Sequence, residues 1–365
     1  MKNKILFILK ILILIIVLIL PVNRLSLFVS VLGKTSDDPD KTAALFYYLP
    51  KDTVDVLIMG NSHAFCSFIN KNIYDDTGIA SATISTSAAS PTNEYWELKE
   101  ALKTQRNIKL VILETSSFEG QALQNIQNSK LHFTSGISIL PDVSLNKMLN
   151  FVDIKNHPYG ISDTIGFEDV LGIVEFSGDT EKDTYRNFDE IRYLITEPAR
   201  LYKTFGFSPQ VLVHEIDEIT TYKFNKEYVD FTKTYAYEYL EKIYELCKEN
   251  NIEILLARSL YNSDRDLLFM NEQIDSWAKE HGVPLIDYFS LIDECEFDLK
   301  TDFRDEDHLN YWGAKKATKY LISYLEENYD FVDHRGDSNY VLWEEADFDY
   351  AKVDEEIEEN IRKKS

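Results

Sequence analysis

The chain has 365 residues, a formal net charge of −24, and 13% aromatic residues, which supply ample material for a large core. So large an excess of carboxylates excludes nucleic acid as a partner, because its phosphates would be repelled rather than neutralised, and it argues against an anionic lipid surface as a ligand. The three cysteines, Cys66, Cys247 and Cys295, have no metal-ligand spacing, so we expect them to be buried as small apolar residues.

Residues 1–33 predict a transmembrane signal anchor. Two lysines precede an apolar run from Ile5 to Leu20, in which Lys10 is the only charge. About 20 apolar residues cross a bilayer. The early lysines predict a single-pass membrane protein with a cytoplasmic amino terminus and an extracellular globular domain. A cleaved signal peptide is the alternative, but no small-x-small cleavage site is evident near the end of this segment.

Residues 34–330 predict one α/β domain. Short, fully apolar segments alternate with amphipathic segments of helical period, which is the rhythm of a parallel sheet of about five strands. The expected strands are Val54–Met59, Ile79–Ile84, Ile108–Leu113, Ile252–Ala257 and Pro284–Ile286. The expected helices are Asn93–Thr104, Tyr235–Asn250, Asp264–Glu280 and Gly313–Tyr329, with a further helix at Ala43–Leu49 packed on the domain.

Two regions depart from this rhythm. Residues 118–231 predict a mostly helical insertion that covers the active-site face, because so long a connection is rarely structureless. Its three histidines, His132, His157 and His214, are expected at the surface or hydrogen-bonded in the core. Residues 331–365 form an acidic tail whose aromatic residues are expected to pack on the domain before a solvated charged end.

A glycine and two small polar residues end the first expected strand, in the sequence VDVLIMGNSHAFCS (Val54–Ser67). Gly60 permits a sharp turn, and Asn61 and Ser62 follow at the carboxyl end of the strand, where ligands bind in open α/β sheets. Two interpretations are open. Asn61 and Ser62 cap the next helix, or Ser62 is a nucleophile.

A second polar motif lies near the end of the domain, where Asp305 and His308 are three residues apart. This spacing places both side chains on one face of a helical turn, so that the carboxylate can orient the imidazole. His308 would then be the general base for Ser62. His63, next to the nucleophile, is expected to point away. We interpret the neighbouring Asp302 and Asp307 as solvated residues, and expect neither a metal nor a cofactor.

The strand ending in Gly-Asn-Ser, and the late Asp-x-x-His followed by Leu309, Asn310 and Gly313, resemble the first and last blocks of the SGNH (GDSL-like) hydrolase superfamily. The resemblance covers most of residues 50–330 as an order of strands and helices. It implies a flavodoxin-like three-layer sandwich and a serine hydrolase whose catalytic triad is Ser62, Asp305 and His308.

Two blocks of the SGNH pattern are not matched. The family has a glycine after the second strand and an asparagine after the third, and both help to bind the oxyanion. In this chain Thr86 or Ser87, and residues 114–116, stand at the corresponding places. The amide of Ser62 and a donor from the Thr86 loop are therefore the expected oxyanion ligands. Arg258, directly after the fourth strand, either holds an anionic substrate group or forms a structural ion pair.

Together with the anchor, the layout resembles bacterial cell-surface proteins that serve cell-wall or polysaccharide acylation. Three functions compete. The first is an esterase acting on acyl esters of cell-surface glycans. The second is an O-acyltransferase accessory that passes an acyl group from a membrane acyl exporter to a cell-wall or exopolysaccharide hydroxyl, with a multi-pass membrane acyltransferase as its partner. The third is a non-catalytic protein that binds glycan or serves as a scaffold. The expected partners are accordingly an acylated glycan or an acyl donor.

Overall fold

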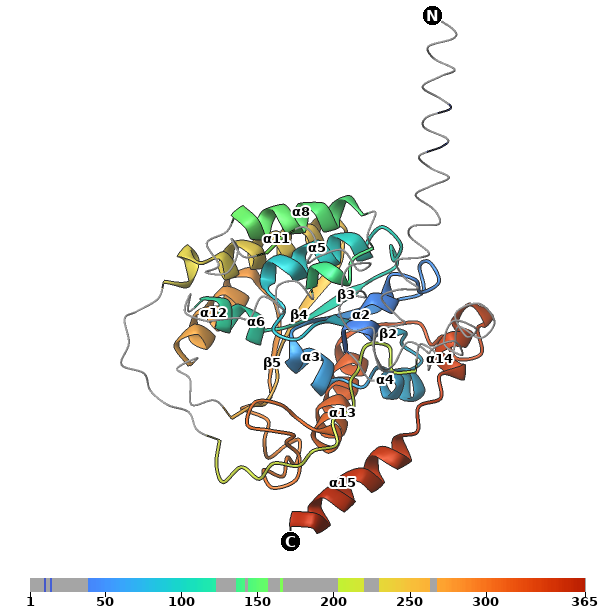
Figure 1. Ribbon diagram of the computed structural model, residues 1–365, viewed down its shortest axis with the longest axis vertical. Coiled ribbons are helices and arrows are strands. Elements are labelled where there is room, and N and C mark those ends of the chain that lie inside the picture. The colour runs from blue at the N-terminus through green and yellow to red at the C-terminus, as the bar shows by residue number, and fades with distance from the viewer. Residues whose placement is uncertain are drawn as a thin grey trace, which may run out of the picture.

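The computed structural model describes residues 39–122, 136–141, 144–156, 165–166, 203–219, 230–262 and 268–364, together with Lys10 and Leu14. This part of the chain forms an α/β fold around one parallel sheet (Figure 1). Apart from those two residues the predicted anchor lies outside the described residues, as do His132 and His157. Among the helices that the structure describes, none is both long and apolar enough to cross a bilayer.

The sheet has five strands in the order β2-β1-β3-β4-β5, and all neighbouring strands are parallel. They are β1 (Val56–Gly60), β2 (Ser81–Ser85), β3 (Leu110–Glu114), β4 (Glu253–Arg258) and β5 (Leu285–Asp287). The first three strands are buried throughout, as expected for parallel strands covered on both faces. The chain reverses its direction of winding between β1 and β3, and such a switch point is where ligands bind in open α/β sheets.

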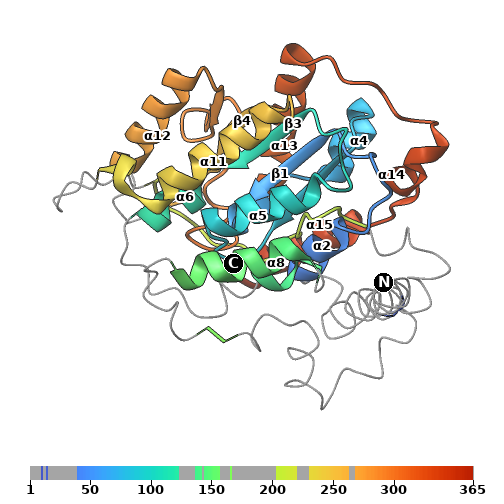
Figure 2. The same cartoon turned by 90° about the horizontal axis from the view of Figure 1, so that it is seen from above.

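Helices cover both faces of the sheet. Because side chains alternate along each strand, each face has a core of its own. Leu57 and Met59 of β1 belong to one core cluster, and Val56 and Ile58 belong to another. The first face carries α2 (Pro39–Phe46), α5 (Pro91–Ala101), α11 (Tyr235–Glu249) and α12 (Leu268–His281), with α6 (Ser116–Ala122) and α8 (Leu145–Asn156) packed on these helices (Figure 2). The second face carries α3 (Ser62–Ser67), α4 (Asn70–Thr77) and α13 (Tyr311–Asn328).

The predicted α/β class and the five-stranded parallel sheet are confirmed, with strand ends shifted by one or two residues. The helix expected from Asn93 begins at Pro91. Ser90 caps it by accepting a hydrogen bond from the Asn93 amide at 3.2 Å, and proline suits the first helical position. The fold therefore places the carboxyl ends of β1, β2, β3 and β4 along one edge.

The carboxyl-terminal segment folds back on the domain through η5 (Ser338–Tyr340), α14 (Val341–Glu345) and α15 (Tyr350–Lys364). The Trp343 side chain is fully buried and stacks on Phe205, with ring centroids 4.6 Å apart. In α15 the side chains of Val353 and Ile357 are buried in the cluster that holds Tyr311. The aromatic residues pack as predicted, and the charged residues at the end of α15, such as Arg362 and Lys363, are exposed as expected, although they lie on a helix that the sequence analysis did not predict.

Candidate active site

Ser62 is the first residue of α3, directly beyond β1. Gly60 before it has a φ of +152°, and a Cβ atom there would lie 2.8 Å from the Cβ of Glu114 and 3.0 Å from that of Ala64. Only glycine permits this close approach of the first and third strands. Asn61 caps the helix, because its side-chain oxygen accepts the amide of His63 at 3.0 Å. The capping role thus falls to Asn61 and leaves the Ser62 hydroxyl available.

The structure brings together three side chains that the sequence analysis singled out. The Ser62 Oγ lies 2.7 Å from His308 Nε2, and His308 Nδ1 lies 2.8 Å from Asp305 Oδ1. Ser62 and His308 are half-buried, and the side chain of Asp305 is 41% exposed. This unbroken hydrogen-bond line has the order of a nucleophile, a base and an orienting acid.

Asp305 and His308 lie in a loop of bends, so the predicted helical turn was wrong. The loop is closed by its own backbone, since the Arg304 amide donates to the His308 carbonyl at 2.9 Å. The Asp307 amide donates to Asp305 Oδ1 at 2.9 Å, and Arg304 Nε lies 3.1 Å from Asp305 Oδ2. These loop contacts, rather than a helical turn, hold the carboxylate behind the imidazole.

Asn310 attaches this loop to the start of α13. Its side-chain oxygen accepts the amides of Trp312 at 2.9 Å and Gly313 at 3.2 Å, and its Nδ2 donates to the carbonyl of Thr301 at 2.6 Å. A Cβ atom at Gly313 would lie 2.5 Å from the carbonyl oxygen of Asp302. The asparagine and the glycine of the late motif therefore position the histidine loop.

The protonation of the site follows from its charges. Burial raises the pKa of the Asp305 carboxyl, but the hydrogen bond from His308, the His308 charge, the Asp307 amide and Arg304 together lower that pKa to about 2. A carboxylate can only accept hydrogen bonds, so we assign the imidazole proton to His308 Nδ1. The lone pair of Nε2 then faces the Ser62 hydroxyl, as a general base requires.

The two oxyanion candidates differ in exposure. They follow β2, whose Ser85 pairs with Gly60 in the sheet, so they lie at the same edge as Ser62. Thr86 is fully buried, and among the described residues its Oγ1 has no hydrogen-bond partner, whereas Ser87 is exposed. Ala88 has a φ of +50°, in the left-handed region that favours glycine. A strained turn thus stands near the place where the SGNH pattern has a glycine.

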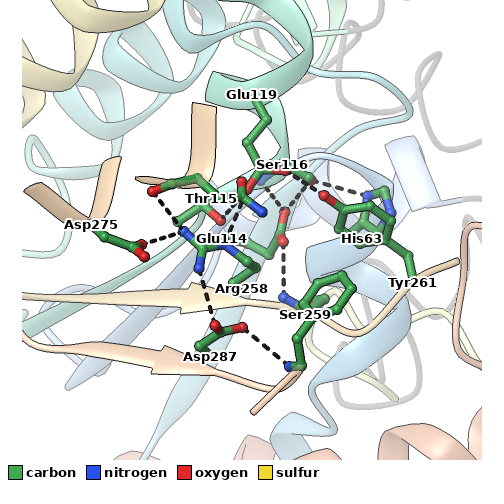
Figure 3. Close-up of polar contacts among 12 residues, drawn as sticks. His63, Glu114, Thr115, Ser116, Glu119, Arg258, Ser259, Tyr261, Asp275 and Asp287 are labelled. Carbon is green, nitrogen blue, oxygen red and sulfur yellow. Dashed lines mark hydrogen bonds and ion pairs between the residues drawn. The ribbon is translucent and has the colours of Figure 1, made fainter. Parts of the chain in front are cut away.

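Arg258 is buried inside the fold, with a side chain only 2% exposed. Its guanidinium lies 2.6 Å from Asp275, 3.3 Å from Asp287 and 3.4 Å from Glu119 (Figure 3). Burial alone would lower the pKa of Arg258, but the three carboxylates raise it above its usual value. The geometry is that of the structural ion pair, the alternative to substrate binding.

Other polar residues of the sequence analysis also have structural contacts. Asp302 is buried rather than solvated, and its carboxylate lies 2.6 Å from Lys316 Nζ. The backbone amide of His214 donates to the Phe303 carbonyl at 2.7 Å, which joins the insertion to the histidine loop. The three cysteines are buried and free.

His63 does not point away from the site, so that prediction was wrong. Its ring stacks on His308, with centroids 4.9 Å apart and planes at 25°. Ser116, after β3, has its Oγ 3.0 Å from His63 Nδ1 and 2.8 Å from Asn61 Oδ1. The sequence held one signal for this contact, because residues 114–116 stand where the SGNH pattern has its asparagine.

A scan against models of known protein families finds no match to this chain, and a search of curated proteins finds no relative. The function must therefore be argued from the geometry of the site.

Proposed function

We propose that this chain is a serine esterase or acyl hydrolase of the SGNH type, with Ser62 as nucleophile, His308 as general base and Asp305 as orienting acid. The observation that carries the proposal is the hydrogen-bond line from Ser62 Oγ through His308 to Asp305, with contacts of 2.7 and 2.8 Å. Further support comes from the strand order 2-1-3-4-5, which is that of flavodoxin-like sheets, and from the position of Ser62 at its switch point.

Acylation follows from this arrangement. As Ser62 Oγ attacks the carbonyl carbon of an ester, its proton passes to His308 Nε2, and the carbonyl oxygen becomes an oxyanion. The resulting imidazolium is stabilised by the Asp305 carboxylate. It then gives the proton to the leaving alcohol as the ester bond breaks, which leaves the acyl group on Ser62.

Deacylation repeats these steps with water. His308 takes a proton from water as its oxygen attacks the acyl carbon, and returns the proton to Ser62 Oγ as the carboxylic acid leaves. Each oxyanion needs fixed donors, for which we assign the backbone amide of Ser62 and a group from the 86–88 loop.

The substrate we propose is an acyl ester of a cell-surface glycan, and the place of action is the outer face of the cell membrane. Support for both comes from the apolar run between Ile5 and Leu20, which predicts an anchor and an extracellular domain. The anchor also favours a second candidate, in which a glycan hydroxyl replaces water and the acyl group arrives from a multi-pass membrane acyltransferase. Both candidates share the acyl-Ser62 intermediate.

The test is covalent labelling of the full chain in detergent micelles with a serine-directed fluorophosphonate, followed by peptide mapping. We expect one label, on Ser62, and none in Ser62→Ala. Ser67→Ala is the matched control, because Ser67 lies on the same short helix and its hydroxyl bonds to Ser259 at 3.0 Å. Labelling that persists in Ser62→Ala would place the nucleophile elsewhere.

Hydrolysis and transfer are separated after labelling succeeds. A model acetyl ester is supplied with and without a polysaccharide acceptor, and both free acetate and acetylated polysaccharide are measured. An esterase produces acetate at a rate that the acceptor does not change, whereas a transferase produces acetylated polysaccharide in proportion to the acceptor.

A further inference from the structure

The ring of His63 lies between two other rings at the site. One is His308, on which it stacks, and the other is Tyr261, whose ring is tilted at 61° with centroids 5.1 Å apart. Desolvation of the His63 ring, followed by the His308 charge, lowers the pKa of His63 to about 3. His63 is therefore uncharged at neutral pH and does not repel the imidazolium that His308 becomes during acylation.

A chain of hydrogen bonds behind His63 fixes the plane of its ring. Nδ1 lies 2.9 Å from Asn61 Oδ1 and 3.0 Å from Ser116 Oγ. The Ser116 hydroxyl also contacts the Glu114 carboxyl, which in addition accepts the amides of Ser116 at 3.1 Å and Ser259 at 3.3 Å (Figure 3). Glu114 is fully buried, and its contacts with the catalytic base run through Ser116 and His63.

The protonation of Glu114 sets the direction of these bonds. The ionised carboxylate accepts the Ser116 hydroxyl proton, so Ser116 Oγ can only accept from His63, and His63 must carry its proton on Nδ1. A protonated Glu114 instead donates to Ser116 Oγ, and the Ser116 proton turns to Asn61 or to His63 Nδ1. Ionisation of Glu114 thus locks one tautomer of the ring against which the catalytic base is stacked.

We infer that His63 is a positioning residue for His308, held by Asn61 and Ser116 and controlled by the buried carboxyl of Glu114. This inference rests on the proposed function, in which His308 is the base. Burial raises the pKa of Glu114 to about 7, against the lowering effect of Ser116, and the Glu119 charge adds to the rise. The change of state therefore falls in the neutral range, where acylation is measured.

Other titratable groups face the same chain of bonds. Glu114 is faced by Glu119 of α6 and Glu94 of α5, and His63 is faced by His308, Asp305, Tyr261 and the backbone of Asp307. Glu119 differs from Glu114 in having a charge partner, because Arg258 lies beside Glu119. The loop groups Asp305 and Asp307 remain in every variant described below, so their effect on the pH profile is common to all.

The experiment measures the second-order rate constant of fluorophosphonate labelling at Ser62 from pH 5 to pH 9, with the full chain. We expect the pH profile of the wild type to contain a step near pH 7, which we assign to Glu114. In Glu114→Gln, which mimics the protonated acid, the step near pH 7 is lost and labelling above it is slower by about tenfold. Ser116→Ala and His63→Phe, which keep Glu114 but cut the chain of bonds, are expected to lose the same step.

Asp55→Asn is the matched control. Asp55 is a buried carboxylate immediately before β1, at the opposite edge of the sheet, where it pairs with His334 at 2.9 Å. This variant is expected to lose stability but to keep the wild-type pH profile. A purely structural role for Glu114 would likewise change stability alone.

A second measurement checks that Glu114 titrates in the folded protein. Its folded pKa of about 7 lies above the ordinary value of 4.5. Stability from this group is therefore fully present below pH 4.5 and is lost as the pH rises through 7. The unfolding free energy of the wild type relative to Glu114→Gln is expected to fall across this window in urea titrations.

The outcomes separate the two proposals. If Ser62 is labelled and Ser116→Ala and His63→Phe both keep the step near pH 7, the positioning role is wrong while the serine hydrolase stands. If Ser62 is not labelled, the proposed function is wrong, and the positioning role that rests on it is wrong as well. Should Glu114→Gln not fold, the same decision is made on Ser116→Ala and His63→Phe.

Discussion

Two charged groups of side chains lie at the same edge of the sheet, the Ser62–His308–Asp305 line and the Arg258 cluster. In the cluster, three carboxylates surround a guanidinium that is 2% exposed. In the line, the carboxylate is 41% exposed and the chain of bonds ends at a half-buried hydroxyl. A position at the ligand-binding edge is thus shared by both groups. Both groups have this position, so the half-buried Ser62 hydroxyl is what distinguishes the candidate catalytic site from the structural cluster.

The largest expected effect in activity is that of His308→Ala. Loss of the base removes proton transfer, and the rate of model ester turnover is expected to fall by a factor of about 10² to 10⁴ or more. The half-buried position of His308 predicts that the variant still folds, which circular dichroism checks. Full turnover in a folded His308→Ala protein would show that His308 is not the base and that the hydrogen-bond line from Ser62 to Asp305 is structural.

Asp305→Asn is expected to be severe but milder than His308→Ala. The imidazole keeps its place through the loop contacts, while it loses its tautomer preference and its partner charge. Turnover is measured at matched folded fraction. Because the pKa of Asp305 is about 2, below the ordinary 3.8, its stabilising contribution is present above pH 3.8 and is lost as the pH falls through 2. The wild type should therefore lose more stability than Asp305→Asn across that window.

Arg258→Met is expected to show the opposite pattern, with a large effect on stability and a small one on chemistry. Removing the cation leaves the fully buried Glu119 without its charge partner, which typically costs about 3 to 5 kcal/mol. Urea unfolding measures this cost. Fluorophosphonate labelling per folded molecule should stay within about twofold of the wild type. A folded variant with intact stability but a raised KM would instead make Arg258 a substrate ligand.

The smallest effects are expected at the other carboxylates of the histidine loop. Asp307→Asn should change neither turnover nor stability measurably, because Asp307 is exposed and contacts Asp305 through its backbone amide. Asp302→Asn should also leave turnover of the folded protein unchanged, although it weakens the buried pair with Lys316. A loss of turnover at either position equal to that of Asp305→Asn would show that the wrong acid was assigned.

The strands and the contact between Asp305 and His308 could be predicted because each leaves a local pattern. Apolar runs identify buried strands, and the Asp-x-x-His spacing identifies a carboxylate and an imidazole that can meet. The loop geometry could not be predicted, since it depends on Asn310 binding Thr301 and on the close contact of Gly313 with Asp302. No periodic pattern in the sequence indicates that these residues come into contact.

The partners of Arg258 and the orientation of His63 depend on tertiary structure in the same way. Glu119 was assigned to the irregular insertion, yet it lies on α6 beside Arg258. The ring of His63 was expected to point away because it follows the nucleophile, but the short helix α3 turns it onto His308. For α15 a signal was present, since Val353, Ile357 and Ile361 recur at helical spacing in an otherwise charged segment.

The most direct test of the central claim is the mass of the intact chain, quenched with acid during turnover of an acetyl ester. The account predicts a population heavier by one acetyl group, mapped to Ser62 by peptide sequencing, present in the wild type and absent from both Ser62→Ala and His308→Ala. Turnover of the ester with no adduct at Ser62, or an adduct that persists in Ser62→Ala, would contradict it.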